Sequence, residues 1–571
     1  MADLNKPRIL RLCQLGLVAL AFVLSASTSA QDLAQIGRKN KPSLSGSFSL
    51  QGGPYFYSGD GTPRNQPFYW NSTGSITLSI WGWQAPFSYS VGSQERGYTQ
   101  PFNRYGLSPY YKWVKLHLGY RTMRFNPYTF AGLQFFGAGI ELEPKGFRFG
   151  AFYGRFNKPI AQDTLGAIIP IPAYRRMGMG VKIGAGSRRN YIDLMFFRAE
   201  DDASSIPDVA PGTRVAPMEN FAVGLSSRIG IGQHLSWEMD LGSSLITNDT
   251  RNPELDTSNV PDFLTTVFRP RLGSRALFAG NTSLRWTSRR FSIRAVYKEV
   301  EPGYRSLGAF YQQTDLRAIT IEPSFNIRKN TIRVSGSIGL QEDNIRSTKI
   351  TQSVRRIGSA RVAWNPTRAY GIDASFSNYC IAQEAGLRVL NDTFRVAQVN
   401  RMYMVSQRLS LINKERTWTA TLTGGLQQLK DLNPFGTYNT SNNDVLYANF
   451  YIGRIRNRDN LSVNGGINFN QNQTTNGTFM LLGPTLGFSK PFFSTKLTVA
   501  ISASFNKAFQ EGSDAGTTIN GSSSFQYRLS KSHRLQLTMT ALQNKTTFVA
   551  SREFTEVRFM AGYTFTFQTK P

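Results

Sequence analysis

Residues 331–340 read Thr-Ile-Arg-Val-Ser-Gly-Ser-Ile-Gly-Leu, and this stretch decides the fold. Apolar residues and one glycine fill the even positions from Ile332 to Leu340, whereas Thr331, Arg333 and two serines stand among the odd ones. Successive side chains of a β-strand point to opposite faces. One face of this strand is therefore expected to meet an apolar medium and the other to meet water.

The same two-residue period recurs in residues 417–426 and 496–506, and it runs from Ser43 to Phe567. Long runs of such strands are typical of a β-sandwich or a β-barrel. If the chain is a barrel, the polar positions face its lumen. We expect this of Arg333, Thr419, Thr421, Asn468 and Lys496.

The first 30 residues indicate which medium covers the apolar face. Lys6, Arg8 and Arg11 precede an apolar run at 15–24, and small residues at 28–30 offer a cleavage site. We predict a signal peptide over 1–30 and a short periplasmic segment over 31–42. No later segment approaches 18 consecutive apolar residues, so an exported barrel in an outer membrane is favoured over a helical membrane protein.

Composition agrees with one domain over residues 43–568. The sequence has two cysteines, Cys13 in the predicted signal and Cys380, so the mature chain has no pair for an intrachain disulfide. A mean hydropathy of -0.30 is compatible with a membrane barrel, because only alternate residues face lipid.

The connections predict the topology. Short turns are expected at sites such as Trp83–Gln84, Ser108–Pro109 and Lys490–Pro491, and they alternate with long polar connections. Short periplasmic turns and long extracellular loops are typical of outer-membrane barrels. We predict about 26 antiparallel strands, or 24 if one hairpin is absent, and the weakest signals are the first strand, Ser43 to Leu50, and the pair around Tyr105 and Val114. Such a wall encloses a lumen on the order of 50 Å across.

Aromatic and basic residues gather near the predicted short turns, where an interfacial girdle belongs. Acidic residues gather in the long connections instead. We therefore place the short turns at the periplasmic rim. The residues assigned to this rim are Trp83, Trp113, Trp364, Arg189, Arg290, Lys329 and Arg458.

The formal net charge of +29 does not indicate nucleic acid, because the cations ring one edge of an exported chain rather than clustering on a recognition element. Two explanations stay open. The basic turns contact anionic lipid headgroups, or they are solvated turns without a specific partner.

The sequence offers little catalytic chemistry. Of three histidines, only His117 lies away from a predicted short turn, so it is the one candidate base for a loop-side hydrolase. A lone strand histidine is more often structural. No spacing of ligands indicates a metal or another cofactor.

The block from Tyr105 to Gly139, with Gly154-Arg155-Phe156 and Pro217 to Asn220 after it, resembles uncharacterised outer-membrane barrel proteins of Bacteroidota. Gln31 directly after the cleavage site is similar to proteins of that phylum. The resemblance implies fold and location, and it implies no catalytic residue.

Three functional classes follow. The first is a porin-like channel, with Ile168, Ile169, Ile171 and Tyr174 as a possible constriction loop. The second is a scaffold or secretion-associated barrel whose loops bind a partner protein or lipopolysaccharide, and the third is a hydrolase. A plugged transporter is disfavoured because only residues 31–42 precede the first strand. Outer-membrane lipid and the barrel assembly machinery are the expected partners in each case.

Overall fold

The computed structural model describes most of the chain beyond residue 41. The described residues are 42–93, 102–162, 171–207, 215–256, 265, 267–310, 313–349, 351–385, 397–431, 442–547 and 553–569. The predicted signal peptide and nearly all of segment 31–42 lie outside them.

Within these residues the chain forms 27 β-strands. Their bounds are β1 Ser43–Gly59, β2 Phe68–Ile80, β3 Trp83–Gly92, β4 Arg104–Leu107, β5 Tyr110–Tyr111, β6 Val114–Asn126, β7 Phe130–Leu142, β8 Phe147–Asn157, β9 Arg175–Gly186, β10 Tyr191–Asp202, β11 Glu219–Ile231, β12 Leu235–Thr247, β13 Arg275–Thr287, β14 Phe291–Val300, β15 Leu316–Ile327, β16 Ile332–Glu342, β17 Thr351–Trp364, β18 Tyr370–Ala385, β19 Ala397–Ile412, β20 Arg416–Asp431, β21 Asn443–Arg456, β22 Leu461–Thr474, β23 Gly477–Phe492, β24 Leu497–Gln510, β25 Ser513–Arg528, β26 His533–Thr546 and β27 Phe554–Gln568.

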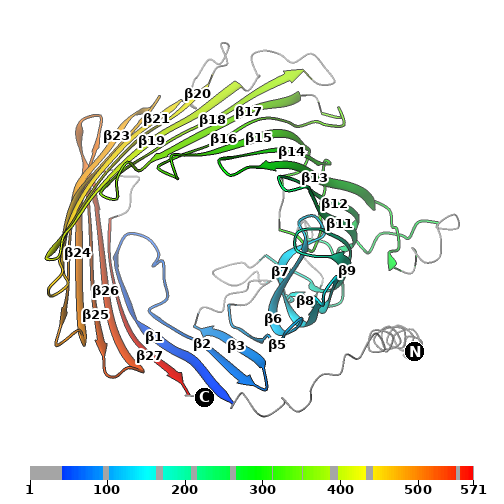
Figure 1. Ribbon diagram of the computed structural model, residues 1–571, viewed down its shortest axis with the longest axis horizontal. Coiled ribbons are helices and arrows are strands. Elements are labelled where there is room, and N and C mark those ends of the chain that lie inside the picture. The colour runs from blue at the N-terminus through cyan, green and yellow to red at the C-terminus, as the bar shows by residue number, and fades with distance from the viewer. Residues whose placement is uncertain are drawn as a thin grey trace.

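The strands close into one antiparallel barrel (Figure 1). Successive strands pair around the ring, and β1 pairs with β27 from Ser45–Gln568 to Gly59–Phe554. Both β4 and β5 lie between β3 and β6, so the 27 strands fill 26 positions in the wall. The prediction of an all-β barrel with 26 rather than 24 strands is confirmed. The pairing of β1 with β27 removes the free edges at the two ends of the sheet.

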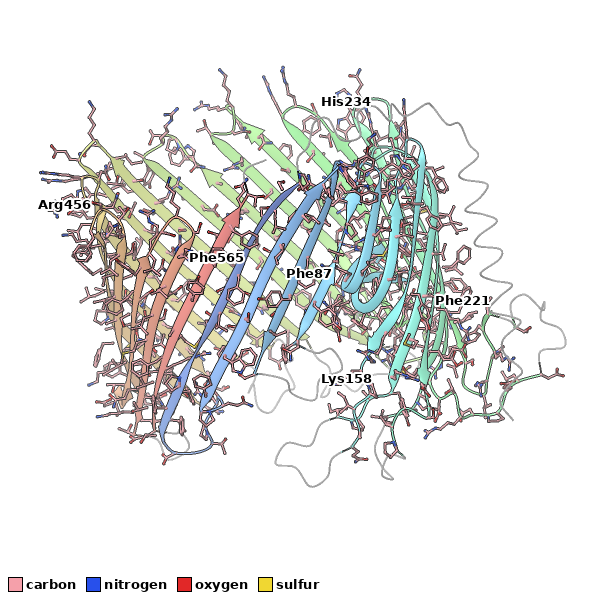
Figure 2. All side chains as sticks on the ribbon, turned by 90° about the horizontal axis from the view of Figure 1, so that it is seen from below. Phe87, Lys158, Phe221, His234, Arg456 and Phe565 are labelled. Atoms are coloured by element: carbon pink, nitrogen blue, oxygen red, sulfur yellow. The ribbon has the colours of Figure 1, made fainter. Side chains whose placement is uncertain are left out.

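The outward face of the wall is apolar and exposed. Ile338 is 72 % exposed and Leu486 is 67 % exposed, and large apolar side chains are exposed on strands throughout the ring. A soluble protein rarely leaves so much contiguous apolar surface uncovered, whereas the outer face of a membrane barrel contacts lipid. Figure 2 shows the two rims of the wall, with His234 and Arg456 at the short-turn rim and Lys158 at the opposite, loop rim.

The turns at the short-turn rim differ in three places from the sequence prediction. The β2–β3 turn is Trp81–Gly82 rather than Trp83–Gln84, and the β23–β24 turn lies at 493–496 rather than at Lys490–Pro491. Trp81 and Gly82 have φ of 52° and 84°, as a two-residue hairpin turn requires. Ser108–Pro109 is a break between β4 and β5, because proline cannot donate to the ladder. The chain turns at Lys112–Trp113 instead.

The expected alternation of short and long connections also fails in three places at the loop rim. Residues 127–129, 475–476 and 511–512 are short connections where long ones were expected. Glu511 and Gly512 form a tight hairpin turn with φ of 50° and 78°. Residues 127–129 are short for another reason, because Tyr128 and Thr129 are buried in the interior.

Candidate functional site

The interior has two parts, and the first is a water-facing lumen. On β24, β25 and β26 side chains are exposed on both faces of the wall. Ile501 and Leu537 are exposed outward, while Ser502, Asn520 and Gln536 are exposed on the inward face. A wall with exposed side chains on both faces separates two media, and hydroxyl and amide groups on the inner face favour water there.

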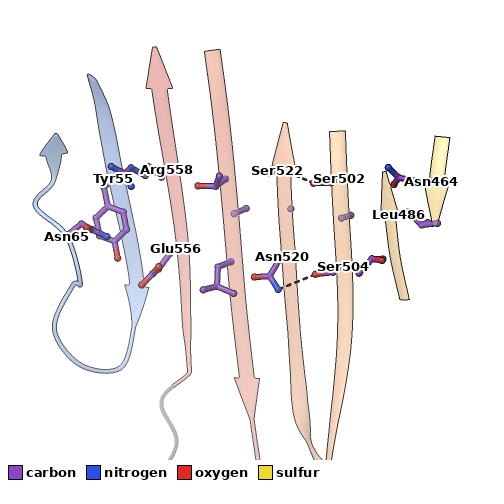
Figure 3. A pocket seen from close by; sticks show the side chains of 16 residues that line it. Tyr55, Asn65, Asn464, Leu486, Ser502, Ser504, Asn520, Ser522, Glu556 and Arg558 are labelled. Atoms are coloured by element: carbon purple, nitrogen blue, oxygen red, sulfur yellow. Dashed lines mark hydrogen bonds between the residues drawn. The ribbon is translucent and has the colours of Figure 1, made fainter. Parts of the chain in front are cut away.

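A recess of about 570 Å³ marks this inner wall (Figure 3). Hydroxyl and amide side chains from β24 to β26 line it and bond to one another. Ser502 Oγ lies 2.9 Å from Ser522 Oγ, and Asn520 Nδ2 donates to Ser504 Oγ at 3.3 Å. The charged side chains of Glu556 and Arg558 also line the recess, so it presents both neutral and charged polar groups to a passing solute.

One described connection reaches into the lumen beside this recess. Figure 1 shows the β1–β2 connection, residues 60–67, bending into the ring. Arg64 Nε lies 3.4 Å from Glu556 Oε1, and its guanidinium carbon lies 4.5 Å from the centre of the Phe554 ring. Tyr55 N donates to Pro67 O at 2.8 Å, which holds the end of the connection against β1.

The second part of the interior is a packed lobe, defined as strands β6 to β12. Figure 1 shows these strands drawn together at one side of the ring. Their inward side chains form an aromatic cluster in which ring centroids lie 4.3 to 6.5 Å apart. Its members are Phe130, Phe135, Phe152, Phe156 and Phe197, all at most 5 % exposed. The lobe is therefore a protein core and not a water-filled passage.

Glycines in the inner wall make room for these rings. A Cβ on Gly178 would lie 2.4 Å from the Phe156 ring, and one on Gly180 would lie 2.5 Å from the Phe152 ring. The glycines that alternate along β9 are thus packing positions. They do not form a phosphate-binding loop.

The β14–β15 connection is described at residues 301–310 and 313–315, and these residues cover the lobe from inside the barrel. Tyr304 Oη donates to Tyr128 O at 2.8 Å, and Ser306 Oγ donates to Thr129 O at 2.6 Å. Phe130 and Gly308 form a parallel β-bridge, with Ala131 N donating to Gly308 O at 3.0 Å. The connection and the β6–β7 turn therefore form one inner layer, and we call residues 301–310 and 313–315 the inner connection.

Two buried asparagines fix this layer to the wall. Asn220 donates to Ser244 Oγ at 2.7 Å and to Leu245 O at 2.9 Å, and its Oδ1 accepts from Leu307 N at 3.0 Å. Asn126 donates to Leu225 O at 3.3 Å and to Leu241 O at 3.2 Å. Both side chains are fully buried.

An ionic contact holds the far end of the inner connection. Lys349 pairs with Asp315, and Ile345 N donates to Asp315 Oδ1 at 3.0 Å. Burial alone would raise the pKa of Asp315, but the bonds from Lys349 and from two backbone N–H groups lower it below its ordinary value. The carboxylate therefore stays ionised at neutral pH.

A charged layer continues the lobe interior towards the short-turn rim. Arg148 makes two bonds to Asp193, at 2.8 and 2.9 Å, and His117 Nε2 lies 2.6 Å from Glu141 Oε1. His117 is only 3 % exposed. A hydrolase base must reach its substrate, so this geometry favours a structural hydrogen bond over the hydrolase hypothesis.

The residues predicted to line the lumen lie on several strands. Arg333 on β16, Thr419 and Thr421 on β20, and Asn468 on β22 alternate with outward-exposed apolar neighbours such as Ile338, Leu422 and Ile467. This parity turns them inward. Lys496 differs, because it lies exposed in the turn before β24 and not in the wall.

The predicted constriction loop is described only in part. Ile168 and Ile169 lie outside the described residues. Ile171 is 80 % exposed, whereas Tyr174 is 6 % exposed and buried next to the start of β9. The connection that packs against the lobe from inside the barrel is the inner connection instead.

The residues assigned to the periplasmic rim all lie at the short-turn rim. Trp83 begins β3 and stacks on Tyr111 with ring centroids 5.5 Å apart. Trp113 is 44 % exposed in a turn, and Trp364 is 42 % exposed at the end of β17. Arg189, Arg290, Lys329 and Arg458 occupy the turns after β9, β13, β15 and β21.

Sequence reasoning missed the lobe, the inner connection and the two buried asparagines. The sequence of β10 does indicate the lobe, because its odd and even positions are both apolar. Leu194 and Phe196 alternate with Met195 and Phe197. A barrel strand that is apolar on both faces meets an apolar medium outside and a packed core inside. Leu194 is 42 % exposed and Phe196 37 %, whereas Met195 and Phe197 are buried. The sequence positions that meet the inner connection carried no such signal.

Among the described residues, no cluster of His, Cys, Asp and Glu could hold a metal ion. Within the same ranges, no helix is long and apolar enough to cross a bilayer.

No protein-family model and no curated protein sequence matches the chain. Solved structures with a distant likeness include Acinetobacter baumannii OccAB2, with a TM-score of 0.30, 11 % identity and coverage of 66 % of this chain and 97 % of that chain. Pseudomonas aeruginosa OpdK with vanillate has a TM-score of 0.29 and 11 % identity, and the match covers 69 % of this chain and 98 % of that chain. The P pilus usher (PapC) translocation pore has a TM-score of 0.35 and 10 % identity, and the match covers 92 % of this chain and 100 % of that chain. With every TM-score below 0.5, the function has to be argued from the residues of this chain.

Proposed function

We propose that the protein is a porin-like outer-membrane channel that passes hydrophilic solutes through the lumen beside the packed lobe. The observation that carries the proposal is that β24 to β26 have exposed side chains on both the inward and the outward face of the wall. Ser502, Asn520 and Gln536 are exposed inward where Ile501 and Leu537 are exposed outward. Hydroxyl and amide groups on the inner face suit water and neutral polar solutes.

The lobe supports the same function by narrowing the ring. A ring of 26 positions would enclose a lumen on the order of 50 Å across if nothing filled it. Phe130 and its neighbours fill one sector, and the inner connection covers that sector from inside. The conducting path then runs along the other sector, past residues 60–67.

Location and orientation belong to the same proposal. The exposed apolar outer face favours a bilayer, and the predicted signal peptide favours export. We place the short turns in the periplasm and the loop rim outside the cell, where lipopolysaccharide is the expected lipid. Insertion by the barrel assembly machinery, and kinship with the Bacteroidota proteins, stay predictions.

Single-channel recording on the purified barrel in planar bilayers tests the channel. We expect stable open steps. We also expect Ser522→Cys, placed on a Cys380→Ser background, to lose conductance when a bulky water-soluble thiol reagent is added. Ser522 is exposed on the inward face.

A matched control separates lumen blockage from damage to the wall. Ser523→Cys lies one residue away on the outward face, so the same reagent should leave its conductance unchanged. Absence of stable steps from the folded barrel would refute the channel and favour a scaffold. Equal inhibition of both variants would refute the assignment of the faces.

A further inference from the structure

The wall parts between β4 and β6. Gly106–Gly119 and Leu107–Leu118 join β4 to β6, two pairs join β5 to β6 next to the turn, and Leu116 N donates to Pro109 O at 2.8 Å between them. By contrast, β1 and β27 pair along nearly their whole lengths. In the described part of the chain, no strand pairs with the β4-facing edge of β6 beyond Gly119.

Gly119 is the point of divergence. Its φ is +83°, and a Cβ on this residue would lie 2.6 Å from Tyr105 O. Glycine adopts this conformation without the steric cost that other residues have. Beyond it β6 bends into the barrel, where Asn126 bonds to the backbone of β11 and β12.

The outward side of this parting is aromatic. Tyr105 of β4 lies 5.9 Å from Tyr120 of β6 and 5.8 Å from Phe136 of β7, measured between ring centroids. Tyr105 is 51 % exposed. Arg155 Nη2 donates to Tyr120 Oη at 3.3 Å. The rings bridge the seam by side-chain contacts alone, so one ring can move without breaking a backbone ladder.

The inward side carries an arginine. Arg121 Nη1 donates to Ser88 Oγ on β3 at 2.9 Å, so this side chain crosses the parting. Arg121 Nε is buried and has no hydrogen-bond partner in the part of the chain that the structure describes. A buried donor without a partner carries a desolvation cost that an anionic ligand would relieve.

An open sheet edge within hydrocarbon is costly, because lipid offers its N–H and C=O groups no partner. At this parting such an edge meets aromatic rings outside and a guanidinium inside. We propose that the parting is a lateral portal for a single-chain anionic amphiphile, with its alkyl chain on Tyr105, Tyr120 and Phe136 and its headgroup on Arg121. This proposal rests on the proposed membrane location but not on solute conduction.

The charge and the geometry select this ligand class. Arg121 favours an anionic headgroup. The three rings lie close together, so a single alkyl chain can contact all of them at about 4 Å. A lipid with two chains would need a wider separation of β4 and β6, which Gly106–Gly119 and Leu107–Leu118 oppose.

Photolabelling of the full-length protein in lipid nanodiscs tests the portal. The probe is hexadecanoic acid with a mid-chain diazirine, and adducts are mapped by mass spectrometry. We expect adducts at Tyr105, Tyr120 and Phe136. We expect Arg121→Gln to reduce them about tenfold, the effect of roughly 1.4 kcal/mol of lost binding, and Arg121→Lys to retain most of them.

Arg558→Gln is the matched control, since Arg558 also lies beside a tyrosine ring, 5.0 Å from the centre of Tyr69, on another sector. Its labelling should match that of the unaltered protein. Adducts spread evenly over the outward face, or insensitive to Arg121, would overturn the portal.

Competition on the unaltered protein avoids any folding defect. Unlabelled hexadecanoate should suppress the adducts, and hexadecyltrimethylammonium should not. Equal suppression by both would overturn the role of charge. A two-chain diazirine phosphatidylglycerol that labels the same three residues as strongly would overturn the single-chain assignment. Its labelling of Leu486, which is 67 % exposed, reports membrane insertion independently of the portal.

Discussion

At the residue scale, Asn220 shows how a single buried amide organises the interior. It joins two wall strands and the inner connection through bonds to Ser244, Leu245 and Leu307. Asn220→Ala leaves Leu307 N and Leu245 O without these partners in a buried site. We expect a loss of about 1 to 3 kcal/mol in the free energy of unfolding, measured by denaturant titration in detergent micelles.

Asn468→Ala is the control for this substitution. Asn468 lies on β22 among half-exposed side chains, so its loss should change stability by less than about 0.5 kcal/mol. Equal effects of the two substitutions would mean that Asn220 does not anchor the inner connection.

Asp459 offers a pH test in a short turn outside the strands. The hydrogen bond and charge of Arg456 lower the pKa of Asp459 to about 2. Because the folded pKa is depressed, the contribution of this pair is present above the ordinary value near 3.9 and is lost as pH falls through about 2. Carboxylate NMR should follow this titration. Arg456→Gln should move the pKa towards the ordinary value, and an unchanged pKa would contradict the pairing.

At the element scale, the lobe strands are stabilised by a buried aromatic cluster. Phe130 is fully buried, and its ring centroid lies 4.3 Å from that of Phe152 and 5.7 Å from that of Phe197. We expect Phe130→Ala to cost about 3 to 5 kcal/mol, because it leaves a cavity in a closed core. Denaturant titration measures the loss.

Phe505→Ala removes the same side chain from the outward face of β24, where Phe505 is 43 % exposed. Its cost should be clearly smaller, since no closed cavity is left. A cost for Phe130→Ala no greater than that for Phe505→Ala would show that the lobe is not a rigid core.

The same contrast explains how much of the fold could be predicted. Strands such as β16 and β20 alternate cleanly, because one face meets an apolar medium and the other meets water, and their number and pairing followed from that period. On β10 the odd and the even positions are both apolar, so the two-residue alternation is weaker there. The alternation therefore did not predict the packed lobe. The site on the inner connection depends on contacts such as Tyr304 with Tyr128, 176 residues apart in sequence. No local pattern encodes a contact of that length.

At the scale of the whole molecule, the lumen wall is not uniform in charge. The inward faces of β24 to β26 carry mainly hydroxyl and amide groups, whereas Arg333 and Arg408 are exposed inward on β16 and β19. Among the described residues neither of these arginines forms an ion pair. The neighbouring acid Asp373 is held by Arg361 at 2.7 Å.

Unpaired inward arginines predict that the channel prefers anions, because basic side chains that line a pore raise the local concentration of anions. The reversal potential in a potassium chloride gradient measures this preference. Arg333→Gln combined with Arg408→Gln should shift it towards the value of an unselective pore, and the shift should shrink at high salt as the charges are screened. Arg458→Gln, in a turn at the short-turn rim, removes the same charge from outside the wall and should leave the reversal potential nearly unchanged. If the double substitution has no effect, or if the unaltered channel prefers cations, then ions do not pass along this face of the lumen.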